Sequence, residues 1–93
     1  MVIGVVTANI SIPDAHSLKD KRSVVRSLKD RILHKMNVSV AEVGRQDAWQ
    51  YAELAFVTVA ANSTLVQSRI SDLSRFLRGN PRYVLLDLHT EML

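Results

Sequence analysis

The sequence predicts an α+β fold in which two helices cover one face of a four-stranded antiparallel sheet. Strand-like and helix-like hydrophobic patterns alternate along the 93 residues in the order β-α-β-β-α-β. Each predicted helix has a single apolar stripe, so both helices must pack against the same sheet. The first and third predicted strands are apolar on both sides, which indicates central positions in that sheet.

Residues 2–12 form the first predicted strand, because Val and Ile dominate and apolar residues alternate with polar ones towards its end. Ser17 then offers an N-cap oxygen to a helix whose apolar residues recur at helical spacing. Asn37 is expected to stop this helix in a left-handed conformation. Residues 38–43 predict a short second strand, and residues 44–47 predict the turn that follows it.

Residues 49–61 predict a third strand that is long and rich in apolar side chains. Thr64, with Gln67 three residues later, fits the capping-box pattern at the start of a second helix. Gly79 is expected to end that helix. Residues 83–91 alternate apolar and polar side chains in part and predict the fourth strand.

These elements, joined by right-handed crossovers, predict one ferredoxin-like domain over residues 1–93. This arrangement leaves one face of the sheet without helices. Ile3, Val5 and Thr7 are expected on that face, together with one side of the third strand. An apolar face of this kind is usually covered, so a homodimer is predicted, through the sheet face or through the hairpin that carries Trp49.

The composition excludes several classes of site. The chain has no cysteine, so disulfides, thiolate metal sites and cysteine nucleophiles are excluded. The apolar residues 1–12 lack a basic flank and are too short to span a bilayer, so we expect a cytoplasmic protein with no membrane partner. The net charge is +3, and residues 15–36 hold seven Lys or Arg against two Asp. This asymmetry favours an anionic partner.

The basic residues of the first helix are the first candidate site. Their spacing of three or four residues predicts one exposed row beside the buried stripe, formed by Lys19, Arg22, Arg26 and Lys29. Long cationic side chains repeated along a rigid helix suit the recognition of phosphates. The alternative is a solvated face with no ligand. Lys21 falls towards the apolar stripe and is expected to snorkel to water.

The turn after the second strand is the second candidate. Within residues 44–50, Arg45, a glutamine and the single Trp49 could stack on a base and form hydrogen bonds with its edge. The alternatives are that Trp49 closes the end of the core or contacts a second subunit.

No residue pattern predicts catalysis, a metal site or a cofactor. His16, His34 and His89 have no shared spacing and are expected to be isolated surface residues. Glu42 and Glu53 lie on facing strands and could pair across the hairpin, although pairing with Arg or Lys is favoured. The sequence contains no nucleophile elbow and no glycine-rich phosphate loop.

Two functions known on this fold class are disfavoured by specific segments. Residues 12–17, which connect the first strand to the helix, lack the arginine and glycine of an acylphosphatase loop. RNA-recognition motifs stack bases on aromatic residues of the central strands, and the first strand here has none. RNA, if bound, is therefore expected at the helix and the hairpin instead of the sheet face.

Two motifs carry a resemblance to a known family. An Ile-Pro pair at residues 12–13 precedes SLKDKR at residues 17–22, and NVSVAEV at residues 37–43 runs on to QD and WQ at residues 46–50. With the first strand, they make the chain similar to the YlxP-like family of small uncharacterised bacterial proteins. The resemblance implies a ferredoxin-like fold. It also implies a ribosome-associated RNA-binding role, since genes of this family commonly lie beside those for translation initiation and ribosome maturation.

The sequence thus favours a non-enzymatic accessory protein that binds RNA or a ribosomal particle, with phosphates held by the basic row and a further contact from Arg45 and Trp49. The competing hypothesis is a dimeric protein-interaction module with no nucleic-acid role.

Overall fold

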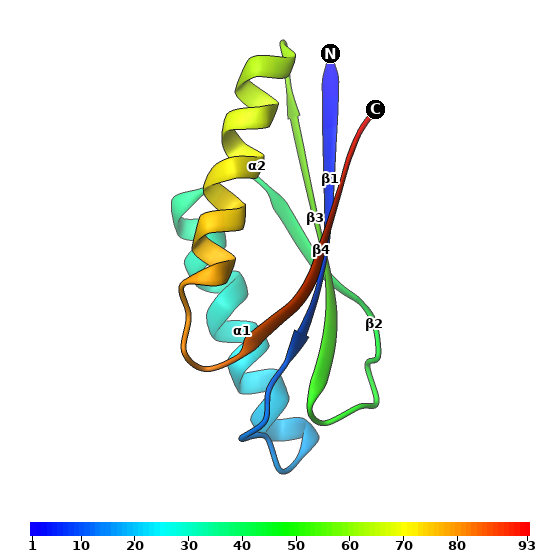
Figure 1. Cartoon of the computed structure of the whole chain (residues 1–93), viewed down its shortest axis with the longest axis vertical. Helices are drawn as coiled ribbons and strands as arrows, with labels where there is room; N and C mark the ends of the chain where they lie inside the picture. The colour runs from blue at the N-terminus through cyan, green and yellow to red at the C-terminus, as the bar shows by residue number, and fades with distance from the viewer.

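Four strands and two helices follow one another in the predicted order in the computed structural model, which describes residues 1–93 (Figure 1). The elements are β1 (Val2–Ser11), α1 (Leu18–Lys35), β2 (Ser39–Gly44), β3 (Tyr51–Ala60), α2 (Ser63–Arg78) and β4 (Val84–Met92). The strands lie in the order β2-β3-β1-β4, and every neighbouring pair is antiparallel. The predicted ferredoxin-like α+β fold and the central positions of β1 and β3 are confirmed.

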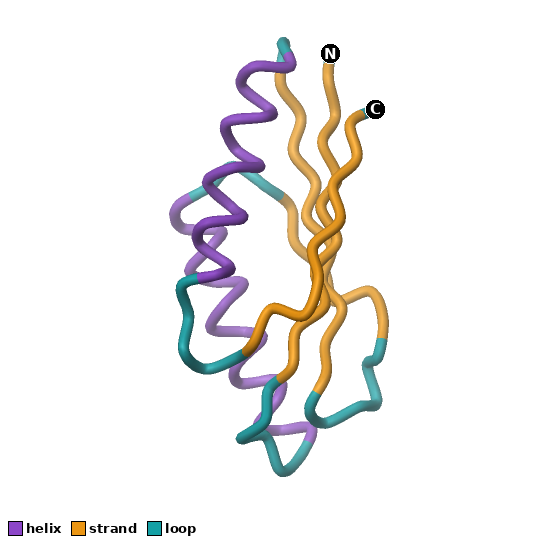
Figure 2. The backbone as a smooth tube through the Cα atoms, in the orientation of Figure 1, coloured by secondary structure: helices purple, strands orange, loops and turns teal.

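Both helices lie on one side of the sheet, and the other side is bare (Figure 2). The hydrophobic core forms between the two layers, from alternate residues of β1 and β3 such as Ile10, Leu54 and Phe56. Their neighbours in sequence point to the bare side, which we call the open face. Ile3 and Val5 lie on this face, as predicted, and are half-buried by their cross-strand neighbours. Neither helix is long and apolar enough to cross a membrane.

The start of α1 is as predicted, and its end is not. The Ser17 Oγ accepts a hydrogen bond from the Asp20 N–H at 3.1 Å, which satisfies one of the unpaired amides of the first turn. The prediction of a left-handed Asn37 is wrong. The helix ends instead through Met36, which is extended at φ −133° while its N–H bonds to the Ile32 carbonyl.

The N-cap of α2 lies two residues before the predicted one. The Asn62 side chain accepts a hydrogen bond from the Leu65 N–H at 2.9 Å, so Asn62 and not Thr64 caps the helix. Thr64 belongs to the first turn itself. Gly79 ends α2 as predicted.

A break in the β2–β3 register separates the two acidic residues of this hairpin. Glu42 pairs with Leu54 and therefore lies on the helix side of the sheet. The register then shifts, and Glu53 pairs with Gly44 on the open side. The suggestion that Glu42 and Glu53 pair with each other is therefore wrong, because they lie on opposite faces.

Candidate nucleic-acid interface

The predicted basic row lies on the outer surface of α1. Lys19, Arg22 and Arg26 are exposed, and Lys29 is half-buried. A helix rises about 1.5 Å per residue, so the row extends for about 15 Å along the helix axis. The chain contains two ion pairs, Lys21–Glu42 and Arg75–Asp72, and neither involves a member of the row. None of the four cationic groups therefore forms an intramolecular ion pair.

Two adjoining hollows follow this row, and Arg22 and Arg26 line both of them. The larger is ≈ 680 Å³ and is also lined by Lys19, Arg31 and Asp30. The smaller is ≈ 210 Å³ and extends past Lys29 towards Glu42 on β2. The two hollows are therefore lined by five cationic side chains and by two carboxylates, Asp30 and Glu42.

Arg31 is a member of this surface that the predicted row did not include. Its guanidinium lies 5.2 Å from the centre of the Phe76 ring on α2, and the Lys35 ammonium lies 5.3 Å from the same ring. Both contacts are within cation–π range, so they fix the outer face of α1 against α2. Arg31 follows Lys19 by twelve residues, which at 3.6 residues per turn puts it about 120° around the helix, so the spacing that defined the row did not include it.

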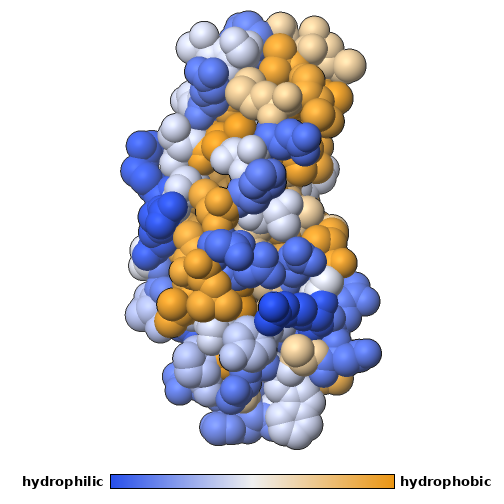
Figure 3. All heavy atoms as spheres, turned by 45° about the vertical axis from the view of Figure 1, so that its right-hand side comes forward, coloured by the Kyte–Doolittle hydropathy of each residue, from blue (hydrophilic) through white to orange (hydrophobic).

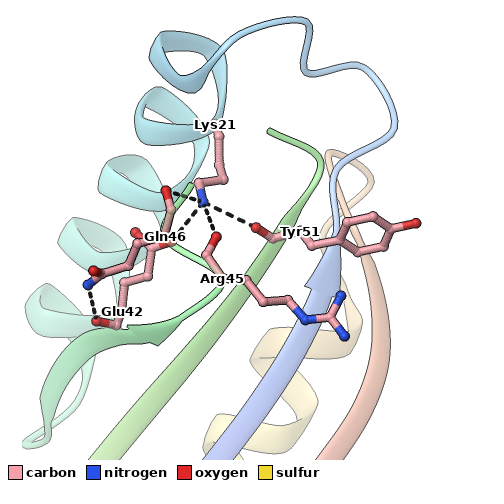
Figure 4. A network of polar contacts seen from close by, with 5 residues as sticks. All are labelled: Lys21, Glu42, Arg45, Gln46 and Tyr51. Atoms are coloured by element: carbon pink, nitrogen blue, oxygen red, sulfur yellow. Dashed lines mark hydrogen bonds and ion pairs between the residues drawn. The ribbon is translucent and has the colours of Figure 1, made fainter. Parts of the chain in front are cut away.

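Lys21 does not snorkel to water as expected. Its side chain is 1% exposed. Its Nζ donates hydrogen bonds to the carbonyl oxygens of Arg45 at 2.8 Å, Gln46 at 3.2 Å and Tyr51 at 3.2 Å. Figure 4 shows the side chain reaching from α1 into the β2–β3 turn. The β2–β3 turn covers the end of the Lys21 side chain, so the ammonium forms hydrogen bonds with three carbonyls of the turn instead of with water.

Glu42 completes the environment of this buried lysine. Its Oε2 lies 2.9 Å from the Lys21 Nζ and has no other partner, and the side chain is 20% exposed. The favoured pairing of this glutamate with a basic residue is thus confirmed. The Gln46 side chain also donates a hydrogen bond to the Glu42 carbonyl at 3.2 Å (Figure 4). One lysine therefore fixes the β2–β3 turn to the helix that carries the basic row.

The β2–β3 turn presents its aromatic and cationic side chains outwards. Arg45 has a left-handed backbone with φ 56°, and its guanidinium lies 5.1 Å from the centre of the Tyr51 ring. In Figure 4 the Arg45 side chain points away from Lys21 towards that ring. Trp49 lies in the turn and is 55% exposed, so it does not close the end of the core. The alternatives that remain for Trp49 are a ligand and a second subunit.

A shallow hollow of ≈ 460 Å³ lies beside Trp49, between the β2–β3 turn and the β1–α1 connection. It is lined by Ala15, His16, Ala48, Trp49, Gln50 and Tyr51. Gln50, which the sequence did not single out as a site residue, holds its two walls together. The Gln50 Nε2 donates hydrogen bonds to the carbonyls of Pro13 and Ala15 at 3.1 Å each. The backbone carbonyl of Gln50 accepts a hydrogen bond from the Ile12 N–H at 2.8 Å.

Comparisons with known proteins identify the family of this chain. Residues 3–90 match the family described as "Protein of unknown function (DUF503)". The chain belongs to the DUF503 family. It is also similar to "Uncharacterized protein YlxP" of Bacillus subtilis (strain 168), with 31% identity over 80 residues, or 86% of this chain and 87% of that protein. The predicted resemblance to a YlxP-like family is confirmed, and it extends well beyond the motifs that suggested it.

Other polar groups of this DUF503 chain lie apart from the two hollows of the basic row. His16, His34 and His89 are all exposed, and no three His, Asp or Glu side chains gather as a metal site would require. A separate hollow of ≈ 300 Å³ at the β1–α1 corner is lined by Asp14, Asp20 and Arg82 among others. Its two carboxylates make it a poorer place for an anion than the outer face of α1.

The structure thus places the predicted site residues in two groups. Lys19, Arg22, Arg26 and Lys29 share the outer face of α1. Arg45 and Trp49 belong to the β2–β3 turn. Lys21, buried between the groups, joins the turn to the helix.

Proposed function

We propose that this protein is a non-enzymatic cytoplasmic accessory protein that binds RNA, alone or within a ribosomal particle, through the outer face of α1. The observation that carries the proposal is a row of four cationic side chains with no intramolecular counter-ion on one rigid helix. A solvated face with no ligand requires no such alignment. Phosphates spaced along a strand are the chemistry that it fits best.

The salt dependence of RNA binding tests this proposal. Each neutralised phosphate contributes about −0.7 to the slope of log K against log salt on single strands and about −0.9 on duplexes. Four contacts by Lys19, Arg22, Arg26 and Lys29 therefore predict a slope between about −2.8 and −3.6. The measurement is a fluorescence anisotropy titration of a labelled stem-loop RNA at several salt concentrations.

A pair of double variants with equal charge separates the α1 surface from a general effect of net charge. Arg22→Gln with Arg26→Gln is expected to reduce the slope by about half. Arg75→Gln with Arg78→Gln removes the same charge from exposed positions in the last turn of α2 and is expected to leave the slope unchanged. Equal weakening by both pairs, or a slope near zero for the unmodified protein, would contradict the proposal.

A second candidate function is pairing of two copies through the open face. The cross-strand rows at one end of this face are apolar: Ile3 pairs with Val59, and Val5 pairs with Val57. Val57 is 42% and Val59 52% exposed, and Figure 3 shows hydrophobic residues gathered towards the end of the molecule where both termini lie. β1 and β3 extend about 33 Å, but β2 has six residues and β4 nine, so four strands that span about 19 Å offer less than about 600 Å². A standard interface buries about 800 Å² per partner.

Light scattering over a range of concentrations tests this pairing. The unmodified chain is expected to have the mass of a dimer. The double variant Val57→Glu with Val59→Glu is expected to be a monomer, because a dimer would bury the two new carboxylates of each subunit in its interface. Leu65→Glu is the control, since Leu65 is 42% exposed on α2, away from the open face. A monomer at every concentration for the unmodified chain would contradict this candidate.

A further inference from the structure

We infer that the hollow beside Trp49 binds one unpaired nucleobase of the same RNA strand whose phosphates lie along α1. This inference rests on the proposed function and names its ligand more closely: a single-stranded segment, recognised by its backbone on α1 and by one base at the β2–β3 turn. Lys21 and Gln50 are positioning residues of this base site.

The lining of the hollow fits a neutral aromatic ligand. Trp49 is 55% exposed and offers surface for stacking, whereas Tyr51 is 40% exposed and has the Arg45 guanidinium 5.1 Å from the centre of its ring. No carboxylate lines the hollow, and His16 and Gln50 supply polar groups at its edge. Its volume of ≈ 460 Å³ lies in the range of about 300–1,000 Å³ that is usual for small-ligand sites.

The hollow is fixed before any ligand arrives. Its walls come from two connections that are far apart in sequence, and the two hydrogen bonds of the Gln50 side chain join them. The Lys21 ammonium holds the carbonyl of Tyr51, whose ring forms part of the lining, together with two other carbonyls of the turn. These bonds fix the backbone on both sides of Trp49, so the walls of the hollow lose little conformational entropy when a ligand binds.

The hollow also lies next to the start of the basic row. His16, in its lining, precedes Lys19 by three residues, and Lys19 lines the large hollow on α1. The corner hollow lies between them, since it shares Ala15 with the base site and Ser23 with the large hollow on α1. One flexible strand that occupies both sites therefore passes the carboxylates of Asp14 and Asp20. Base stacking on the tryptophan then selects unpaired RNA over duplex RNA, whose bases are not free to enter the hollow.

The single tryptophan of the chain makes the test specific, because all tryptophan fluorescence comes from this site. The probes are an oligoadenylate of about ten nucleotides, within the range that a small single-strand-binding module covers, and an abasic chain with the same number of phosphates. Oligoadenylate is expected to quench Trp49, whereas the abasic chain is expected to bind α1 with the fluorescence unchanged.

Substitutions complete the test. Trp49→Ala is expected to weaken oligoadenylate binding about tenfold, since stacking contributes about 1–3 kcal/mol per base, and to leave binding of the abasic chain unchanged. Leu65→Ala, an exposed apolar side chain on α2, is the control and is expected to change neither. Gln50→Ala is expected to weaken oligoadenylate binding when Trp49 is present and to have no further effect in the Trp49→Ala variant. A purely structural role of Gln50 would weaken binding by the same factor in both proteins.

The possible failures are distinguishable. Salt-dependent binding of both probes with equal affinity and no quenching overturns the base site and leaves the phosphate row in place. Binding of neither probe overturns the proposed function and the base site together. A loss of self-association in Trp49→Ala with unchanged oligoadenylate binding overturns the base site in favour of a protein contact.

Discussion

Replacement of the buried Lys21 tests the central structural contact of the candidate site. In Lys21→Met, three turn carbonyls and the Glu42 carboxylate lose their only shared donor. Removal of one partner from a buried pair costs about 3–5 kcal/mol. The Glu42 side chain is 20% exposed, so water can solvate part of what is left. We therefore expect a loss of about 3 kcal/mol, at the lower end of that range.

The matching change at Glu42 is expected to cost much less. In Glu42→Gln the Lys21 ammonium keeps its three carbonyl acceptors, and the new amide can still accept a hydrogen bond through its oxygen. The expected loss is about 1 kcal/mol. In the double variant no charged carboxylate remains unpaired, so we expect the cost to be smaller than the sum of the two single losses by about 1 kcal/mol.

Urea unfolding followed by circular dichroism measures these losses. A domain of this size has a free energy of unfolding of roughly 5–14 kcal/mol, so a loss of about 3 kcal/mol is readily resolved. Lys19→Met, on the same helix but exposed, is expected to change stability by less than about 0.5 kcal/mol. Equal losses in Lys21→Met and Glu42→Gln would refute the account, because that result would mean that the turn carbonyls contribute nothing.

Three further predictions concern the fold. Gly4→Ala is expected to lower the free energy of unfolding by about 1–3 kcal/mol in urea titrations, because its Cβ would lie 2.6 Å from the Val66 Cγ1 on α2. Asn62→Ala is expected to cost about 1 kcal/mol by the same measurement, whereas Thr64→Ala is expected to cost little because Thr64 is not the cap. Burial raises the pKa of Tyr83 from 10.0 to about 12. The unfolded chain therefore ionises this residue first, and stability is expected to fall by about 2 kcal/mol as the pH rises from 10 to 12. Tyr83→Phe is expected to lack this component in unfolding experiments across that range.

Local patterns were enough to predict the architecture and the faces of its elements. Period-two alternation in β1 placed Ile3 and Val5 on the open face, because successive side chains of a strand must point to opposite sides. Helical spacing likewise placed the basic row beside the buried stripe of α1. These properties depend on a few consecutive residues and on covalent geometry, so the sequence contains them directly.

Contacts between distant segments could not be predicted in this way. Helical spacing placed Lys21 near the apolar stripe, but its burial depends on carbonyls 24 to 30 residues away in a turn. The position of that turn is set by the register break after Glu42, which no local sequence pattern predicts. The cap of α2 illustrates a related limit: Asn62 and Thr64 both have suitable side chains, and the choice depends on where β3 ends.

The two proposed surfaces are compatible because the sheet separates them. The basic row lies on the outer side of the helix layer, whereas the apolar rows lie on the open face. Two copies that pair through the open face would therefore carry their α1 helices on opposite outer surfaces. The apolar rows are also centred on Ile3 and Val59, near the termini. Tyr51 and the hollow beside Trp49 lie at the other end of β3, eight residues or about 26 Å from Val59 along the strand. Pairing centred on the apolar end thus leaves both base sites accessible, so a dimer would hold two RNA segments apart instead of clamping one between its subunits.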